Sequence, residues 1–189
     1  MDLFSGIRLK VAKAMLTGRV SKVKRKPSFI NLSDIKSIGI AWNASRTQDF
    51  AVLSRFCQKM HERNIEVTVL GYFQGKNLPD QYTAIRFLTC FKKNELDFFY
   101  RPVRNDVNSF IRNRFDVLIT INFENLFPLV YVSALSEAIL KIGLFGTEPE
   151  NLPYDLMMEL KNSVNVEDYL NQILYYLGMI NSEPVKTAV

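Results

Sequence analysis

The chain has 189 residues, of which 48% are hydrophobic and 12% aromatic, so it is long and apolar enough for one domain with a sizeable core. No apolar run approaches the roughly 18 residues of a membrane-spanning helix, and the two cysteines lack the spacing of a disulfide scaffold, which favours a cytoplasmic protein with reduced thiols. The net charge of +5 is local: residues 1–26 hold eight Lys/Arg and one acid, whereas residues 27–189 hold sixteen Lys/Arg and eighteen acids.

The first 30 residues are expected to form a basic amphipathic helix and a linker. Arg8 and Lys13 lie outside the apolar arc of this helix and Lys10 lies at its edge, while Gly18 is expected to end it before the basic run S-K-V-K-R-K-P. Charges interrupt the apolar positions, so we expect no secretory signal. Two interpretations stay open. The helix packs on its own domain or a second copy, or it makes weak contact with an anionic membrane surface through Arg8, Lys10 and Lys13. The apolar arc comprises Leu3, Phe4, Ile7, Val11, Ala14 and Met15.

The compact domain is expected over residues 31–182 and begins with a β-α-β unit. The runs I-K-S-I-G-I-A-W and I-E-V-T-V-L-G-Y predict the two strands. The polar turn W-N-A-S-R-T-Q-D after the first strand offers Ser45 or Thr47 as a helix N-cap. The crossover is expected to be right-handed. The buried stripe of the connecting helix is predicted to comprise Phe50, Leu53, Phe56, Cys57 and Met60.

Residues 74–115 have a less regular pattern. The run T-A-I-R-F-L-T (83–89) predicts a third strand. The run L-D-F-F-Y-R-P (96–102) indicates a short strand or an irregular segment before Pro102. Val107, Phe110 and Ile111 have the spacing of a short helix.

Residues 115–143 give the clearest prediction of fold class. They indicate a buried strand at 117–121, a helix at 126–136 with Pro128 in its first turn, and a strand at 139–145. The run Y-D-L-M-M-E-L then predicts a strand near the sheet edge, a closing helix is expected to end at Gly178, and residues 183–189 are expected to form a loose tail. The sequence therefore predicts an α/β fold, a three-layer αβα sandwich around a mostly parallel, Rossmann-like sheet of five or six strands.

Polar residues that follow the predicted strands mark a candidate ligand site. In an open parallel sheet, ligands bind beyond the carboxyl ends of the strands. Ordinary capping and turn formation use the same residue types, so that alternative stays open. The sequence lacks G-x-G-x-x-G and G-x-x-x-x-G-K-[ST], and no cofactor is expected. The candidate residues, for an anion, a nucleotide or a nucleotide sugar, are Asn43, Ser45, Arg46, Asn122 and Glu124.

Other reactive residue types favour structural roles. Cys57 and His61 lie four residues apart, but a metal needs three or four ligands and Cys57 falls on an apolar stripe, so no metal site is expected. Asp116 opens a strand at the amino edge, where turn capping is its expected role. Ion pairing on a solvated face explains a group of interleaved charges better than phosphate binding does. That group comprises Arg101, Arg104, Arg112 and Arg114 with Asp97, Asp106 and Asp116.

Three motifs span most of the chain: a basic helix before a strand ending in I-G-I, the run F-D-V-L-I with S-A-L-S-E-A-I-L-K-I-G, and Y-D-L-M-M-E-L before L-N-Q-I-L-Y-Y-L-G. Together they resemble an uncharacterised Bacteroidetes family, a domain of unknown function. Its members tend to carry an S-K-A-like step before K-x-G, where this chain has Ser136-Glu137-Ala138 before Lys141-Ile142-Gly143. The resemblance implies an α/β sandwich without an assigned activity. A weaker likeness to the N-terminal half of heptosyltransferase-type glycosyltransferases concerns the fold rather than sugar transfer.

The sequence favours a non-catalytic binding or interaction module that acts through a protein partner or as a homodimer. Its basic residues gather in one arm instead of on the domain surface, which argues against sequence-specific nucleic-acid binding. Two alternatives remain. The domain binds a small ligand at the strand ends, or residues 1–26 attach it peripherally to a membrane.

Overall fold

The computed structural model of this protein describes residues 3–146, 154–160 and 165–180. Within these residues, six strands form one sheet in the order β3-β2-β1-β4-β5-β6, and every neighbouring pair is parallel. The predicted α/β class with a Rossmann-like sheet is confirmed. The strands are β1 (Ser37–Asn43), β2 (Glu66–Phe73), β3 (Leu88–Lys92), β4 (Val117–Ile121), β5 (Leu140–Leu144) and β6 (Leu156–Met158).

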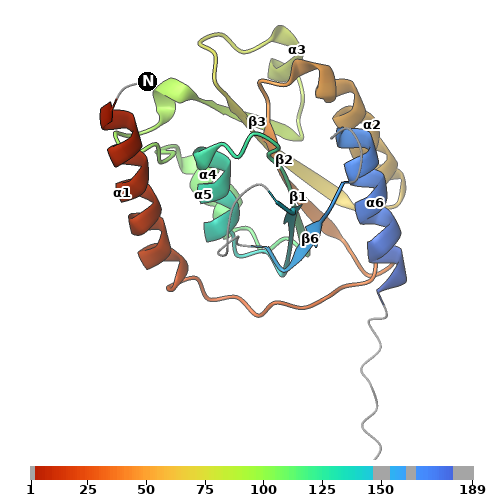
Figure 1. Cartoon of the computed structure of the whole chain (residues 1–189). Coiled ribbons are helices and arrows are strands. Elements are labelled where there is room, and N and C mark those ends of the chain that lie inside the picture. The colour runs from red at the N-terminus through yellow and green to blue at the C-terminus, as the bar shows by residue number, and fades with distance from the viewer. Residues whose placement is uncertain (1–2, 147–153, 161–164, 181–189) are drawn as a thin grey trace, which may run out of the picture.

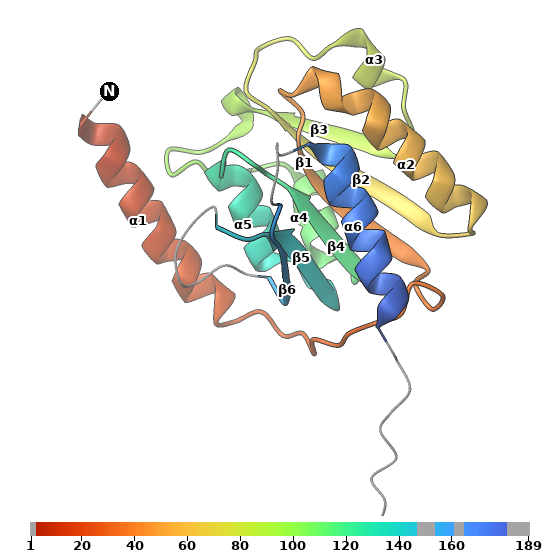
Figure 2. The same ribbon diagram turned by 45° about the vertical axis from the view of Figure 1, so that its right-hand side comes forward.

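Helices cover both faces of the sheet and complete the three layers (Figures 1 and 2). α2 (Phe50–Glu62) and α6 (Val166–Met179) lie on one face. α4 (Asn105–Arg112) and α5 (Phe127–Leu135) lie on the other, with α1 (Leu3–Val20) packed outside α5. None of the described helices combines the length and the hydropathy that crossing a bilayer requires. Three single turns occur in the loops: η1 (Thr47–Asp49), α3 (Asp80–Thr83) and η2 (Lys93–Glu95).

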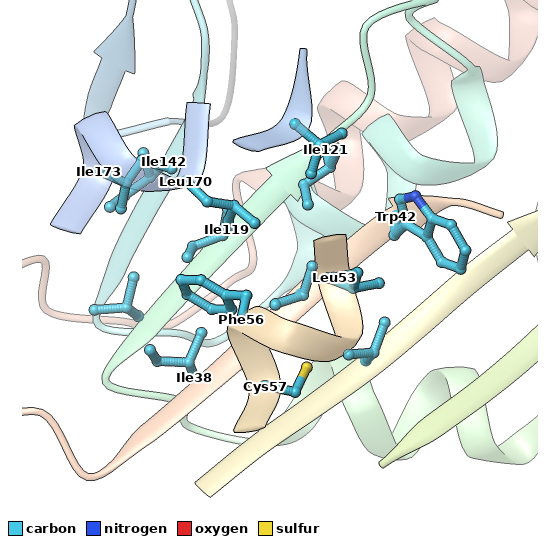
Figure 3. Close-up of a cluster of buried hydrophobic side chains, with 14 of the residues drawn as sticks. Ile38, Trp42, Leu53, Phe56, Cys57, Ile119, Ile121, Ile142, Leu170 and Ile173 are labelled. Carbon is cyan, nitrogen blue, oxygen red and sulfur yellow. The ribbon is translucent and has the colours of Figure 1, made fainter. Parts of the chain in front are cut away.

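Two hydrophobic clusters fill the space between the layers, because alternate residues of a strand point to opposite faces of the sheet. In β4, Ile119 belongs to the cluster under α2 and α6, whereas Leu118 belongs to the cluster under α5. Figure 3 shows the first cluster, where Leu53 and Phe56 of α2 reach toward the sheet near Ile119. Burying each side chain of this size stabilises the fold by about 1.5–3 kcal/mol.

Asp116 fastens β1 to β4 at the amino edge of the sheet. Its Oδ2 accepts hydrogen bonds from the backbone N–H groups of Lys36 and Ser37, at 2.8 and 2.9 Å, and from the Ser37 hydroxyl at 3.2 Å. The Ser37 Oγ in turn accepts from the Asp116 N–H at 3.1 Å. The predicted capping role of Asp116 is therefore confirmed.

Both predicted glycine stops are wrong. α1 continues through Gly18 to Val20, and α6 continues through Gly178 to Met179. Among the described glycines only Gly146 has the positive φ that a left-handed helix cap requires, so Gly18 and Gly178 keep helical backbone. A glycine inside a helix costs only about 1 kcal/mol relative to alanine, which the packing of the helix offsets.

The predicted third strand starts five residues too early. Residues 80–83 form α3 instead, preceded by Pro79, and β3 begins at Leu88. Tyr82 on α3 is buried and its hydroxyl donates to the Ala44 carbonyl at 3.0 Å, so tertiary packing decides the conformation of this segment. Residues 96–102 are irregular, with one antiparallel bridge between Leu96 and Pro102. The predicted tail at 183–189 lies outside the described residues.

Candidate functional site

The sheet order reverses between β1 and β4, and the predicted site lies at this reversal. Asn43 ends β1, and Asn122 and Glu124 follow β4. The Asn43 amide donates to Glu124 Oε2 at 2.6 Å, so two residues far apart in the sequence are in direct contact. In doubly wound folds, this switch point is where ligands bind.

The guanidinium of Arg46 is held by carboxylates of this chain. Its Nε donates to Asp49 Oδ2 at 2.5 Å and its Nη1 donates to Glu124 Oε1 at 3.1 Å. The pKa of Arg46 is raised, chiefly by the hydrogen bond that it donates to Asp49 and further by Glu124, against the opposing effect of burial. Its guanidinium carbon also lies 5.5 Å from the centre of the Phe123 ring. An anion at this position would compete with two carboxylates already in place.

Ser45 and Asn122 serve the turns around this cluster. The Ser45 hydroxyl accepts from the Gln74 N–H at 2.9 Å, and Asn43 Oδ1 accepts from the Ser45 N–H at 3.1 Å. Asn122 accepts from the Leu126 N–H at 2.8 Å and donates to the Leu126 carbonyl at 3.1 Å. The predicted capping of α2 by Ser45 or Thr47 is wrong, because Asp49 occupies the N-cap position and makes no side-chain capping bond.

Trp42 directly precedes Asn43 in β1, and its indole N–H has no hydrogen-bond partner within the described residues. It is fully buried, at one side of the cluster drawn in Figure 3, and its ring centre is 5.5 Å from that of Tyr82 and 6.1 Å from that of Phe50. Its Nε1 has no hydrogen-bond partner in the part of the chain that the structure describes. The sequence offered one signal for this position, a single tryptophan directly before Asn43.

Cys57 and His61 do not form a reactive pair. Cys57 is 4% exposed in the core under α2, and burial raises the pKa of its thiol to about 12, so the thiolate is suppressed at neutral pH. The described residues contain no group of three His, Cys, Asp or Glu that could hold a metal ion. The buried stripe predicted for α2 includes Cys57, and its burial is confirmed.

Two of the four arginines in the predicted group are closely paired with nearby acids. Arg101 meets Asp97 at 2.6 Å, and Arg104 bonds both Glu95, at 3.0 Å, and Asp106. The hydrogen bonds from Arg101 and from backbone N–H groups lower the pKa of Asp97, although its partial burial is the largest single influence and acts in the opposite direction. The predicted local ion pairing is confirmed for these two arginines.

Lys141 is a buried cation that the sequence does not single out. Its side chain is 2% exposed and Nζ donates to the Ala134 carbonyl at 3.0 Å. Its pKa is lowered from 10.5 to about 7, chiefly by burial and also by the positive charge of Arg25, while Asp155 acts in the opposite direction. Its place between the buried neighbours Leu140 and Ile142 was the available signal.

One face of α1 is fixed to the domain. Ala12 and Leu16 are buried against α5, and Arg19 Nη1 donates to the Tyr131 hydroxyl at 2.5 Å. Arg8 donates two hydrogen bonds to the Phe98 carbonyl, at 2.6 and 2.9 Å, and its guanidinium lies 4.2 Å from the centre of the Phe98 ring. The hydrogen bonds of Arg8 and Arg19, on either side of the apolar contact, hold the helix in one orientation.

The face of α1 next to this docked face carries the apolar arc predicted from the sequence, because Val11 and Met15 directly precede Ala12 and Leu16 in the helix. Ile7, Val11 and Met15 recur every four residues and are 57%, 41% and 36% exposed. In both views α1 forms the outer side of the molecule (Figures 1 and 2). The arc is therefore not the surface that docks on the domain, which is formed mainly by Ala12 and Leu16 together with the arginines.

The comparisons with known proteins show a family but no activity. No curated protein matches the chain. A model of a family of unknown function, DUF6913, matches residues 8–180. The predicted relation to a domain of unknown function is thereby confirmed, while the Bacteroidetes range and the heptosyltransferase likeness stay predictions. The match extends from the first turns of α1 to the end of α6 and covers most of the chain, which therefore belongs to DUF6913, a family of unknown function.

Proposed function

We propose that this protein is a non-catalytic binding module that attaches peripherally to an anionic membrane surface through the outer face of α1. The exposed apolar arc of Ile7, Val11 and Met15, on a helix fixed to the domain through the adjacent face, carries this proposal. Apolar residues on one side of a basic helix are the usual means of binding at the interface between lipid headgroups and acyl chains.

The helix is ordered before it binds. The packing of Ala12 and Leu16 and the hydrogen bonds of Arg8 and Arg19 hold α1 on the domain. A surface that is already folded loses less conformational entropy on binding than a helix that must form on the membrane. Attachment then requires only that the arc enter the headgroup region.

The charge of the arm favours an anionic partner. Residues 1–26 carry eight Lys/Arg and a single acid, so a second copy of the same arm would be repelled. Lys10, Lys22, Lys24 and Lys26 are exposed and form no ion pair within the described residues. Each basic residue near an anionic lipid surface contributes about 1 kcal/mol, and the cytoplasmic leaflet has such a surface.

Vesicle sedimentation tests this proposal. The full chain is mixed with vesicles of phosphatidylcholine, with and without phosphatidylserine. We expect binding to the anionic vesicles only, weakened by salt. The triple variant Ile7→Ser, Val11→Ser, Met15→Ser should bind at least about tenfold more weakly, because the binding free energy scales with the buried apolar area.

Met179→Ser is the matched control, because Met179 is a comparably exposed apolar residue (61%) on α6, which covers the other face of the sheet from α1. It should bind like the wild type. Equal sedimentation of wild type and triple variant would overturn the proposal. Analytical ultracentrifugation distinguishes a membrane from a second copy of the chain as the partner of this face. If the wild type is a dimer and the triple variant is a monomer, the partner is a second copy.

A second candidate function is small-ligand binding at the switch point. The unpaired, buried N–H of Trp42 beside the Asn43–Glu124 contact favours it. Trp42 is the only tryptophan, so its fluorescence can be titrated with nucleotides and nucleotide sugars. A saturable change that Glu124→Gln removes would support this function, and a flat titration across both ligand classes would exclude them. The site would comprise Asn43, Ser45, Arg46, Asn122 and Glu124.

A further inference from the structure

A basic hollow lies at the amino edge of the sheet, where the linker after α1 passes the starts of β4 and β5. Its volume is about 690 Å³, within the range of pockets that bind small molecules. Figure 1 shows the linker running below the sheet from α1 toward β1. The residues that line the hollow are Lys24, Arg25, Lys26, Arg114, Glu137 and Ile139.

Arg25 fixes one wall of the hollow. Its two terminal nitrogens donate to the two carboxylate oxygens of Asp155, each at 2.7 Å, and Nη1 also donates to the Ile139 carbonyl at 3.3 Å. Both side chains are mostly buried, with 17% and 15% exposed. Asp155 in turn accepts from the Lys141 backbone N–H at 2.8 Å. The linker is therefore bound to the sheet edge at this residue.

The opposite wall is also built from fixed backbone. The Glu137 N–H donates to the Ile111 carbonyl at 2.9 Å, and the Ile139 N–H donates to the Phe115 carbonyl at 2.9 Å. These two bonds tie the segment before β5 to the segment that carries Arg114. The hollow thus keeps its shape without a ligand.

Three cations of the hollow lack a strong partner. Arg114 is 73% exposed, and its nearest carboxylate, that of Glu137, is 3.7 Å away, too far for a hydrogen bond. Lys24 and Lys26 are exposed, flank Arg25 in the linker and both line the hollow. No ion pair joins either lysine to the residues that the structure describes.

We infer that this hollow binds a phosphate group, either of a lipid headgroup or of a soluble phosphate compound. Arg114 supplies a planar fork of N–H donors that matches two phosphate oxygens, while Lys24 and Lys26 supply mobile point charges. Glu137 opposes the anion and limits its affinity. The site does not depend on the outer face of α1, so it stands or falls separately from membrane attachment.

Calorimetric titration with inorganic pyrophosphate, in a phosphate-free buffer, tests the site on the full chain. We expect saturable binding that weakens about tenfold in Arg114→Gln, which removes the charge-assisted fork. Lys24→Gln and Lys26→Gln should each weaken it by a smaller factor. Glu137→Gln should tighten it several-fold, since the competing carboxylate is lost.

Lys76→Gln is the control, because Lys76 is an exposed lysine outside the hollow. A second arm measures sedimentation with phosphatidylcholine vesicles that contain phosphatidic acid. Arg114-dependent binding of pyrophosphate supports a site for soluble phosphates, and Arg114-dependent binding of the vesicles alone supports a lipid headgroup.

No binding in either arm would overturn the inference. Equal losses in Arg114→Gln and Lys76→Gln would also overturn it, because they would indicate diffuse attraction to positive charge anywhere on the surface. The triple variant of α1 separates the two proposals, since it should lose anchoring in phosphatidylserine vesicles and still bind pyrophosphate.

Discussion

The two edges of the sheet hold charge clusters of opposite design. At the carboxyl edge, one guanidinium, that of Arg46, meets two carboxylates, those of Asp49 and Glu124. At the amino edge, the four cations that line the hollow meet only two carboxylates, those of Glu137 and Asp155. The first cluster is complete within the chain, whereas the second has positive charge left over.

This difference shows that position in the fold does not decide where an anion is attracted. The switch point of a doubly wound sheet is the usual ligand site, yet here its arginine is already neutralised by neighbouring side chains. The amino edge is a less usual place, but Arg114 and two lysines remain unmatched there. Charge balance among neighbouring side chains distinguishes the two edges.

Removing Arg25 should give the largest change. Arg25→Met leaves the mostly buried carboxylate of Asp155 unpaired, and we expect a loss of about 3 kcal/mol in the free energy of unfolding. Urea denaturation measures it. Lys24→Met, one residue away and exposed, should change stability by less than about 0.5 kcal/mol. Similar losses in both variants would mean that Arg25 does not anchor the linker.

Replacing Lys141 should stabilise the protein. Lys141→Met removes a buried amine, and we expect a gain of about 2 kcal/mol in the free energy of unfolding at neutral pH. The pKa of Lys141 is about 7 in the folded state and 10.5 ordinarily, so the unfolded state binds more protons between these values. The contribution of Lys141 to stability therefore rises with pH across that window.

Urea denaturation at several pH values checks this sign. The advantage of Lys141→Met over the wild type should shrink steadily as the pH rises from about 7 toward 10. Lys59→Met, on an exposed position of α2, is the control and should show no such trend. An advantage that stays constant with pH would contradict the lowered pKa.

Opening the carboxyl-edge cluster should have a moderate effect. Arg46→Met removes the guanidinium that both carboxylates share and leaves Asp49, which is 7% exposed, without its cation. We expect a loss of about 1.5 kcal/mol in the free energy of unfolding, because the pair is only partly buried. Arg55→Met, whose ion pair with Glu167 is exposed and 3.8 Å long, should have almost no effect. An unchanged free energy of unfolding in Arg46→Met would show that charge does not hold this cluster together.

Arg114→Gln should have the smallest effect on stability. Its ion pair with Glu137 is long and exposed, so the free energy of unfolding should change by less than about 0.5 kcal/mol. The same variant is expected to lose most of its pyrophosphate affinity, which makes it the converse of Arg46→Met. A large loss of stability would assign Arg114 a structural role and remove the contrast between the two edges.

The sequence predicted the central sheet well because its signals were local. An unbroken apolar run with Pro128 after it indicated a buried parallel strand and a helix, and β4 (Val117–Ile121) and α5 (Phe127–Leu135) follow. The strand predicted over residues 83–89 begins only at Leu88, because Thr83 still belongs to α3. The Tyr82 hydroxyl of α3 bonds the Ala44 carbonyl, a contact between residues 38 apart. Secondary-structure propensity, summed over a short stretch of sequence, carries no information about a contact between residues so far apart.

The site was predicted in part for the same reason. Strand ends could be located, so Asn43 and Glu124 were expected near each other, and they are 2.6 Å apart. That Asp49 would neutralise Arg46 depends on the exact course of the turn and was not foreseen. The hollow was missed because its cations come from the linker and from the segment before β4, which no sequence period connects.

The pairing of Arg25 with Asp155 has a mechanical consequence. It joins the linker to the start of β6, at the opposite border of the sheet from β3. If the contacts of α1 with α5 were broken, a pull on the linker would reach that border strand at Arg25 before it reached β1. The ion pair would then take up load on the linker ahead of the central strands.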